Sequence, residues 1–258
     1  MKPGCFVYKV HYEQRHVEDC IRSLTNLAFY YLHDYPTDVI GFYEDGLSQC
    51  MRDMIVERSG VPVQWHRLEL DIPDHIDKTQ ICCCSIDYMN MCRFMANGVF
   101  QHPALDDYEY HCRLDTDSFI LSSVRQDIFK TFKDNGWWYG YIFDHITEYP
   151  AYYVGLRRAT EDFLKLCPSQ ITQIPLAQLS EGGLYYSNFE VCYRPWFRSY
   201  PWTAYADHVD RTGGHYYHRW TDCTVRYMGV RLFMPEERIA RVEFIHYDHQ
   251  QHVFKPAR

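Results

Sequence analysis

Two hydrophobic periods alternate along the first 60 residues of the chain. The stretch "CFVYKVHY" at residues 5–12 is rich in β-branched and aromatic residues, which predicts a strand. Apolar residues then recur every three or four positions from Val17 to Tyr31, which predicts an amphipathic helix, and "DVIGFYED" at residues 38–45 predicts a second strand. This order indicates a βαβ unit, in which a right-handed crossover joins two parallel strands.

Strand and helix patterns continue to interleave as far as about residue 165. The expected elements are a helix around residues 47–59 that ends at Gly60, a strand within 61–70, a helix from a Ser85 cap to Gly98, a strand at 109–114, a helix capped by Ser122 or Ser123 and closed near Gly136, and a strand at 137–144. Beyond Pro168 the chain is richer in loops and aromatic residues, and no internal repeat or polar linker divides it. We therefore expect one compact α/β unit with a loop-rich C-terminal part.

Composition and charge narrow the classes of function. With 258 residues, of which 47% are hydrophobic and 23% charged, the chain is long enough to bury a core and too apolar for general disorder. Its formal net charge of −8 argues against a nucleic-acid partner, because proteins that bind the phosphate backbone need many Lys and Arg side chains. A small phosphate ligand remains compatible with this charge, since a local cation or metal ion is enough to hold it.

The cysteines and the N-terminus bear on the compartment. The eleven cysteines are odd in number, include the adjacent Cys82, Cys83 and Cys84, and form no CxxC pair, so neither a disulfide framework nor a thiolate zinc site is expected. Free thiols are typical of a reducing compartment. The N-terminal sequence shows no signal peptide and no apolar stretch near the roughly 20 residues that span a bilayer. These features predict a soluble cytoplasmic protein without a membrane anchor.

Two carboxylates one residue apart, Asp115 and Asp117, follow the apolar stretch "EYHCRL" at residues 109–114. Ligands of open α/β sheets bind beyond the carboxyl ends of the strands, so this pair is placed for function. Carboxylate oxygens select Mg²⁺ or Mn²⁺, ions that commonly complete their coordination shell with substrate phosphates. The alternative is a turn in which the two aspartates accept hydrogen bonds from backbone N–H groups.

Motifs of several other reactions are missing from the sequence. There is no GxxxxGK[ST] phosphate loop, no GxGxxG after the first strand and no GxSxG elbow, which argues against P-loop hydrolysis, Rossmann-type redox chemistry and α/β-hydrolase chemistry. The spacing of His246, His249 and His252 is compatible with a metal site, but without a motif context exposed or aromatic-packed histidines are favoured.

Five stretches in the same order resemble the yeast-type α-1,2-mannosyltransferase family (Kre2/Mnt1-like) between about residues 85 and 254. They are "YMNMCRFMANGVFQHPAL", "CRLDTDSFI", "YYSNFEV", "DRTGGHYYHRWTDCTVRYMGVRLF" and "IHYDHQQHVF". The resemblance implies a GT-A glycosyltransferase fold with a mixed, mostly parallel central sheet flanked by helices. It also implies retaining transfer of mannose from GDP-mannose, with Mn²⁺ (or Mg²⁺) as cofactor and a glycan or glycoprotein as acceptor. On this basis residues 1–258 form a single domain, with a nucleotide-sugar-binding part at about 1–165 and an acceptor or catalytic part at about 166–258.

The resemblance also assigns roles to individual residues. Asp115 stands at the family's metal-binding Glu, Asp117 lies two places on, and His249 stands at the family's metal-ligand His. Glu190 aligns with a Glu taken as nucleophile or base, and Asp222 with the Asp of an R-W-G-D segment, so these two are the catalytic candidates. The candidates for binding the donor are Tyr88, Arg93, Arg113 and Asp115, and those for binding the sugar or acceptor are Tyr186, Asn188 and Trp220.

The sequence departs from the family pattern near several of these positions. Asp115-Thr116 replaces Glu-Pro, Tyr186 replaces a Trp and Cys223 replaces an Ala. Two alternatives therefore stay open: a transferase of the same fold that uses a UDP-sugar such as UDP-xylose or UDP-glucose, and a non-catalytic module that binds nucleotides or glycans. Members of the family are Golgi membrane proteins, whereas no anchor is expected here. The resemblance then points to a soluble cytoplasmic enzyme and, as a source, to a virus that glycosylates its own proteins.

Overall fold

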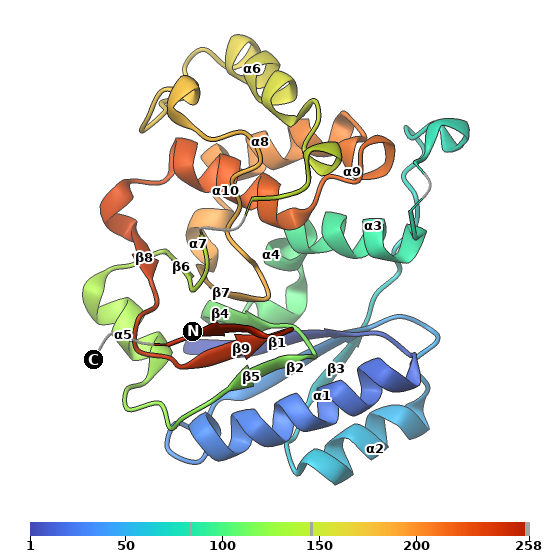
Figure 1. The fold of residues 1–258 in the computed structure, drawn as a ribbon, viewed down its shortest axis with the longest axis vertical. Coiled ribbons are helices and arrows are strands. Elements are labelled where there is room, and N and C mark those ends of the chain that lie inside the picture. The colour runs from blue at the N-terminus through green and yellow to red at the C-terminus, as the bar shows by residue number, and fades with distance from the viewer. Residues whose placement is uncertain (83, 145–146, 256–258) are drawn as a thin grey trace.

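A seven-stranded sheet with the order β3-β2-β1-β4-β7-β6-β8 runs through the middle of the molecule (Figure 1). The computed structural model describes residues 1–258 except 83, 145, 146 and 256–258. The strands are β1 (Lys2–Val10), β2 (Asp38–Tyr43), β3 (Gln64–Arg67), β4 (Tyr108–Leu114), β6 (Tyr139–Tyr141), β7 (Phe189–Tyr193) and β8 (Ile239–Arg241). The first four pair in parallel, as do β6 and β8, and β7 runs antiparallel to both of its neighbours. The expected mixed, mostly parallel sheet is confirmed.

Helices cover both faces of this sheet. In Figure 1, α1 and α2 lie below it, and α3, α8 and α10 lie above it. The helices are α1 (Gln14–Leu27), α2 (Gln49–Ser59), α3 (Ile86–Arg93), α4 (Val99–Gln101), α5 (Ile128–Asn135), α6 (Leu156–Leu166), α7 (Arg194–Phe197), α8 (Tyr200–Arg211), α9 (Gly214–Tyr217) and α10 (Asp222–Phe233). π-helical turns follow α1 at Ala28–Leu32 and α3 at Phe94–Gly98, and short 3₁₀ turns lie at Lys78–Gln80, Pro103–Leu105, Pro150–Tyr152, Leu176–Gln178 and Glu236–Arg238.

Side chains along the central strands alternate between two apolar cores, one on each face of the sheet. Phe6 and Tyr8 of β1 belong to the core that also contains the buried face of α1. Cys112 and Leu114 of β4 belong to the same core. Arg113 lies between these two residues, so its side chain points to the opposite face, towards α10.

A second, three-stranded antiparallel sheet brings the C-terminal segment to the end of β4. It consists of β5 (Ser118–Ile120), β9 (Tyr247–His249) and β10 (His252–Phe254), in the order β10-β9-β5. β5 and β9 pair so that Ser118 lies opposite His249. Because Asp117 directly precedes Ser118, this register places His249 beside a carboxylate from a distant part of the chain.

Most of the expected elements are present, and one helix begins elsewhere than predicted. Ser85 caps α3, as expected. The expected cap at Ser122 or Ser123 is wrong, because α5 begins at Ile128 and Asp127 is its cap. The carboxylate of Asp127 accepts hydrogen bonds from two backbone N–H groups of the first turn, which satisfies two of the donors that a helix start leaves unpaired.

The C-terminal part is more regular than the sequence predicts. The expected loop-rich character applies to residues 167–188, but residues 189–233 contain the central strand β7 and the twelve-residue helices α8 and α10. Nine of the twelve residues of α10 are buried, including polar ones, so the helix shows no single apolar stripe. Because β7 and β8 join the same sheet as β1 to β4, residues on both sides of position 165 build one layer.

The described cysteines differ in their exposure. Cys5, Cys20, Cys92, Cys112 and Cys192 are buried thiols, as expected, but Cys50 is exposed and Cys167 and Cys223 are partly exposed; Cys83 lies outside the described residues. In the part of the chain that the structure describes, no helix has both the length and the apolar character needed to cross a bilayer.

Candidate functional site

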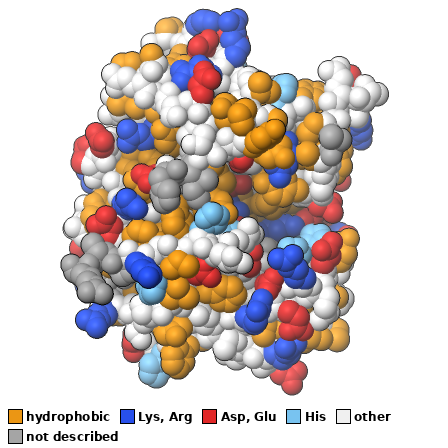
Figure 2. Space-filling model, in the orientation of Figure 1, with side chains coloured by type: hydrophobic (Ala, Val, Ile, Leu, Met, Phe, Trp, Pro, Cys, Tyr) orange, Lys and Arg blue, Asp and Glu red, His pale blue; other side chains and the backbone are white. Residues whose placement is uncertain are grey.

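A cavity of about 500 Å³ opens at the carboxyl ends of β1 and β4. Figure 2 shows a hollow in this face of the molecule, with charged and histidine side chains gathered beside it. The walls of the cavity come from segments far apart in the sequence, within residues 9–16, 85–91, 113–117, 186–188, 222–223 and 249–250. The cavity therefore lies where an open α/β sheet places its ligands.

Asp115, Asp117 and His249 form a compact cluster on the cavity wall. His249 Nε2 lies 3.0 Å from Asp117 Oδ1 and 4.0 Å from Asp115 Oδ2. One donor atom from each of the three side chains lies within 4.8 Å of the others. Two carboxylate oxygens and one imidazole nitrogen make a donor set that fits Mn²⁺, and the three residues that the sequence analysis grouped lie together in space.

Local hydrogen bonds hold the two aspartates in this arrangement. The N–H of Asp115 donates to the carbonyl of Asn188, and the N–H of Ser118 donates to the carbonyl of Asp115, which closes a turn at the end of β4. Burial opposes the charged form of Asp117, but His249 and a hydrogen bond from Gln250 outweigh it and lower the pKa of Asp117 to about 2. This carboxylate is therefore charged at neutral pH.

Arg113 links the cluster to α10. Its Nε donates to Asp115 Oδ1 at 2.9 Å and its Nη1 donates to Asp222 Oδ2 at 2.6 Å, while the hydroxyl of Ser187 also donates to Asp222 Oδ2 at 2.6 Å. Burial opposes the charged form of Asp222, but Arg113 and Ser187 hold its pKa below the ordinary value. Because Arg113 takes one oxygen of Asp115, the other oxygen is the one that faces His249.

Three further predicted residues line the cavity: Tyr88, Tyr186 and Asn188. The ring of Tyr186 meets the ring of His249 edge to face, with the centroids 5.3 Å apart, and burial raises the pKa of Tyr186 to about 12. The side-chain oxygen of Asn188 accepts a hydrogen bond from Tyr247, but its amide nitrogen has no acceptor among the described residues.

Glu190 lies outside the cavity wall, although the sequence places it among the catalytic candidates. Its side chain is 1% exposed, and Arg226 donates to both of its oxygens, at 3.0 and 3.3 Å. The hydroxyl of Tyr139 donates to it as well, at 3.1 Å. Glu190 lies directly opposite Arg113 in the β4–β7 pair, but the two side chains take different partners. Glu190 is therefore buried behind the wall of the cavity and is not among the residues that line it.

Arg93 and Trp220 also lie outside the cavity wall. Arg93 on α3 donates to both carboxylate oxygens of Asp210 on α8, at 2.6 and 2.9 Å, and its predicted contact with the nucleotide-sugar donor stays a prediction. The Trp220 side chain is buried, and its Nε1 donates to the carbonyl of Val154 at 2.7 Å. Both residues join elements of the fold to one another.

Sequence reasoning missed several residues that line the cavity: Lys9, His11, Glu13, His16, Asp87, Met91, Ser187 and Cys223. The stretch "HYEQRH" at residues 11–16 contains two histidines and a glutamate just after the first strand. It satisfies the same rule that singled out the aspartates after β4, since both segments follow the carboxyl end of a parallel strand.

The chain is similar in sequence to known mannosyltransferases. The profile of the family described as glycolipid 2-alpha-mannosyltransferase matches residues 66–258. Alpha-1,2 mannosyltransferase KTR1 from Saccharomyces cerevisiae is 34% identical over 173 residues, which cover 64% of this chain and 44% of that protein. Glycolipid 2-alpha-mannosyltransferase 2 from Candida albicans is 26% identical over 255 residues, which cover 90% of this chain and 55% of that protein. The chain thus spans about half the length of these curated relatives.

Solved structures share the fold. Core-mannan synthase A (CmsA/Ktr4) from Aspergillus fumigatus, in its Mn/GDP form, gives a TM-score of 0.89 at 22% identity, over 99% of this chain and 77% of that chain. The mannosyltransferase Ktr4p from S. cerevisiae in complex with GDP gives a TM-score of 0.89 at 23% identity, over 99% of this chain and 73% of that chain. The GT-A type of fold expected from the sequence is confirmed.

Proposed function

Because the chain belongs to the glycolipid 2-alpha-mannosyltransferase family, we propose that it transfers mannose from GDP-mannose to a glycan or glycoprotein acceptor. The observation that carries this proposal is the convergence of Asp115, Asp117 and His249 on the wall of the cavity. A divalent ion at such a cluster suits a donor whose leaving group is a diphosphate. Two similar structures are described as GDP-bound, one of them also with Mn, which supports guanosine diphosphate as the nucleotide.

We propose Mn²⁺ as the ion that Asp115, Asp117 and His249 hold. Bound there, it would supply Lewis-acid stabilisation of the negative charge that develops on the departing diphosphate. Arg113 supports this site by fixing one oxygen of Asp115 and leaving the other directed at His249. In this role Arg113 positions a ligand of the ion, and its contact with the donor itself is not required.

Residues beside the cluster are placed to bind the donor. Asn188 lines the cavity, and its buried amide nitrogen lacks an acceptor among the described residues, so a rotation of the side chain towards an oxygen of the bound nucleotide sugar would satisfy a group that is costly to bury. Tyr88 and Tyr186 line the same cavity, and their rings are suited to pack against the flat face of a base or the apolar face of a sugar.

We propose that Asp222, and not Glu190, is the carboxylate nearest the reacting sugar carbon. Asp222 lines the cavity, and Arg113 keeps it ionised, so its negative charge stabilises the positive charge that builds on that carbon as the diphosphate leaves. A carboxylate close to the carbon is also the arrangement that favours retention of configuration in related sugar chemistry. Glu190, held by Arg226 in the interior, acts by positioning.

Titration calorimetry with GDP and UDP tests the nucleotide part of the proposal. In the presence of Mn²⁺, GDP should bind at least about tenfold more tightly than UDP, a difference of about 1.4 kcal/mol. Removing the ion with a chelator should weaken the binding of GDP. If UDP binds more tightly, the donor would be a UDP-sugar and not GDP-mannose. If neither nucleotide binds, the proposal is overturned.

A further inference from the structure

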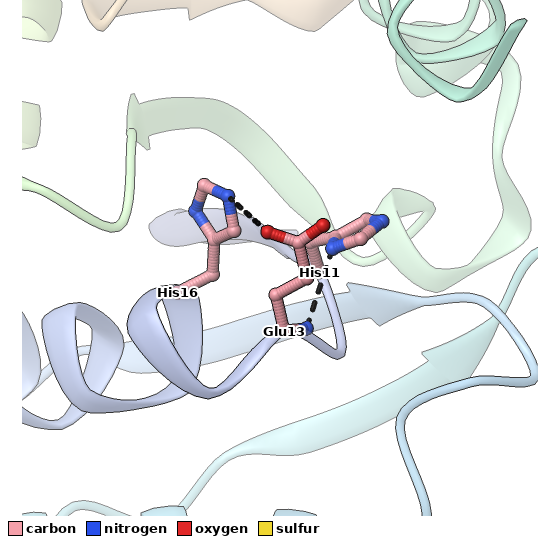
Figure 3. Close-up of side chains that lie close together, drawn as sticks. All are labelled: His11, Glu13 and His16. Atoms are coloured by element: carbon pink, nitrogen blue, oxygen red, sulfur yellow. Dashed lines mark hydrogen bonds and ion pairs between the residues drawn. The ribbon is translucent and has the colours of Figure 1, made fainter. Parts of the chain in front are cut away.

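A second group of metal-ligating side chains lines the cavity apart from the aspartate cluster. His11, Glu13 and His16 lie together where β1 ends and α1 begins (Figure 3). One donor atom from each lies within 4.8 Å of the others. His16 Nε2 is 3.9 Å from Glu13 Oε2, and the two imidazole rings have their centroids 5.5 Å apart. The proposed transfer reaction uses none of these three residues.

The backbone that carries the three side chains is held by regular structure on both sides. His11 comes directly after β1, which lies inside the main sheet between β2 and β4. Glu13 is the N-cap of α1, and His16 lies in its first turn. Residues three apart on a helix surface are neighbours, and Glu13 and His16 have this spacing. The three side chains therefore start from fixed positions and need only their own rotations to converge.

The surroundings of His11 resemble those of a metal-bound imidazole. The lone pair of its Nδ1 accepts a 3.3 Å hydrogen bond from the N–H of Glu13, so it points into the cluster, and a bound ion would take the place of that N–H as its partner (Figure 3). Its Nε2 lies 3.8 Å from Asp87 Oδ2 on α3, and the ring of Tyr12 stacks on it with the centroids 4.2 Å apart. A histidine that binds a metal almost always donates its other N–H to a carboxylate or carbonyl, which fixes the ring and its tautomer. At 3.8 Å, the exposed side chain of Asp87 needs only a small rotation to accept that bond.

We propose that His11, Glu13 and His16 form a second divalent-cation site in this cavity, selective for an ion of the Zn²⁺ class, with Asp87 orienting His11. Two imidazole nitrogens and one carboxylate oxygen are the donors that Zn²⁺ and its neighbours in the transition series prefer, and Mg²⁺ prefers oxygen alone. The aspartate cluster has the reverse composition, with two carboxylates and one imidazole. The two clusters therefore differ in the ions that they select.

The ligand atoms need to move only a short distance to bind an ion. Ligands of a tetrahedral zinc site lie roughly 3.4 Å from one another, because each is about 2.0–2.2 Å from the metal. The side chains of Glu13 and His16 are 62% and 44% exposed, so they are free to rotate by the ångström or so that closure requires. His11, the least exposed of the three at 22%, is the one that its neighbours already hold.

Charge favours a cation over a phosphate at this place. The carboxylates of Glu13 and Asp87 face the two imidazoles, so an anion would meet two negative groups. The two basic side chains of this segment already have acidic partners, since Lys9 is paired with Glu44 and Arg15 with Asp19. The partial positive charge at the start of α1 also favours an anion, but Glu13, at the N-cap, is itself the anion that lies there.

Zinc binding, measured by titration calorimetry in excess Mg²⁺, tests the proposal without reference to sugar transfer. To silence the aspartate cluster, all proteins carry Asp117→Asn. His16→Ala and Glu13→Gln should each weaken the zinc affinity of the cavity by more than about tenfold, and Asp87→Asn by about tenfold, which is the usual effect of losing a group that orients a ligand. His33→Ala removes an exposed histidine outside both clusters and should change nothing.

Two results would overturn the proposal. One is zinc binding that is the same in the parent and in the His16→Ala and Glu13→Gln variants, all with unchanged melting temperature. The other is loss of inorganic phosphate binding in His16→Ala with zinc binding intact, which would identify an anion site. Crystals soaked in zinc give a direct check, since anomalous scattering should place one ion about 2.0–2.2 Å from the ligand atoms of His11, Glu13 and His16. A soaked crystal with no zinc peak at these side chains would also refute the site.

Discussion

Arg113 and Asp222 form an ion pair with a distance of 2.6 Å, and both side chains are more than nine-tenths buried. The pair joins the end of β4 to the first turn of α10, although the two residues are 109 positions apart. Arg113 also holds Asp115 at 2.9 Å, so one guanidinium connects a proposed metal ligand with a proposed catalytic carboxylate. The shape of the cavity therefore depends on the guanidinium of Arg113, which holds the carboxylates of Asp115 and Asp222 on either side of it.

Replacing Asp222 with Ala leaves the buried Arg113 with a single carboxylate partner. We expect the free energy of unfolding to fall by roughly 3–5 kcal/mol, the usual effect of removing one member of a buried ion pair. GDP should also bind more weakly, because Asp115 loses part of the frame that orients it. Chemical denaturation and titration calorimetry measure the two effects.

Asp210→Ala is the matched control, since it breaks the partly exposed pair with Arg93 outside the cavity. It should cost about 1 kcal/mol or less and leave GDP binding unchanged. Equal losses of GDP affinity in the Asp210→Ala and Asp222→Ala variants would show that the Arg113–Asp222 ion pair does not specifically support the binding of GDP.

Asp117→Asn should remove the high-affinity binding of Mn²⁺. The substitution keeps the size of the side chain but takes away one of two carboxylates, and carboxylates are the ligands that such ions need most. We expect the affinity for Mn²⁺, measured by electron paramagnetic resonance of the free ion, to fall by at least about tenfold. Asp71→Asn changes the net charge equally at an exposed position and should bind Mn²⁺ as the unmodified chain does. Tight Mn²⁺ binding in both variants would mean that the ion sits elsewhere.

Glu190→Gln separates a positioning role from a catalytic one. Because Glu190 is the carboxylate partner of the buried Arg226, its replacement should lower the melting temperature by at least about 5 °C in a chain of this size. The double variant with Arg226→Met should regain part of that loss, since it removes the unpaired charge. If Glu190→Gln loses stability and the added Arg226→Met restores part of it, Glu190 acts by holding Arg226 in position. A Glu190→Gln variant that melts like the unmodified chain yet transfers no sugar would return Glu190 to the catalytic set.

His111 should make stability depend on pH below neutrality. Burial lowers the pKa of His111 to about 3, and Arg226, Arg194 and Arg113 act in the same direction. An unfolded chain binds a proton at this residue below about pH 6.5, whereas the folded chain does not. The stabilisation is therefore complete above that pH and is lost as the pH falls towards 3, by up to about 1.4 kcal/mol for each pH unit.

The variant His111→Gln isolates this effect. Its free energy of unfolding, measured by urea denaturation between pH 7 and pH 4, should fall less steeply with decreasing pH than that of the unmodified chain. Parallel curves for the two proteins would show that His111 takes up a proton in the folded state.

The elements that sequence reasoning found are those with local signals. The hydrophobic patterns of two strands and one helix predict the β1–α1–β2 unit from short stretches of sequence. Asp115 and Asp117 directly follow an apolar stretch. The spacing of His246, His249 and His252 did not by itself favour a metal site, and the assignment of His249 came from the family resemblance. The physical cause of the position of His249 is the pairing of β5 with β9, a long-range register that no short stretch of sequence encodes.

Two of the predicted site residues lie outside the cavity wall for a shared physical reason. The family resemblance assigned Glu190 and Arg93 to the site, but each side chain is paired with a partner on a distant helix, Arg226 on α10 and Asp210 on α8. Such partners become visible only when the helices are packed. By contrast, His11, Glu13 and His16 lie in one short stretch after the first strand, so the rule applied to β4 would have found them.

The transfer of mannose from GDP-mannose tests the central claim most directly. A chelator is added after the reaction to remove the ion, and the products are then identified by proton NMR. With Mn²⁺ and methyl α-mannoside as acceptor, the unmodified chain should release GDP and form an α-linked disaccharide. Asp117→Asn should slow this reaction on the order of 100-fold, because the charge on the departing diphosphate is no longer stabilised. An unmodified chain that leaves GDP-mannose intact, or an Asp117→Asn variant that keeps the full rate, would contradict the claim.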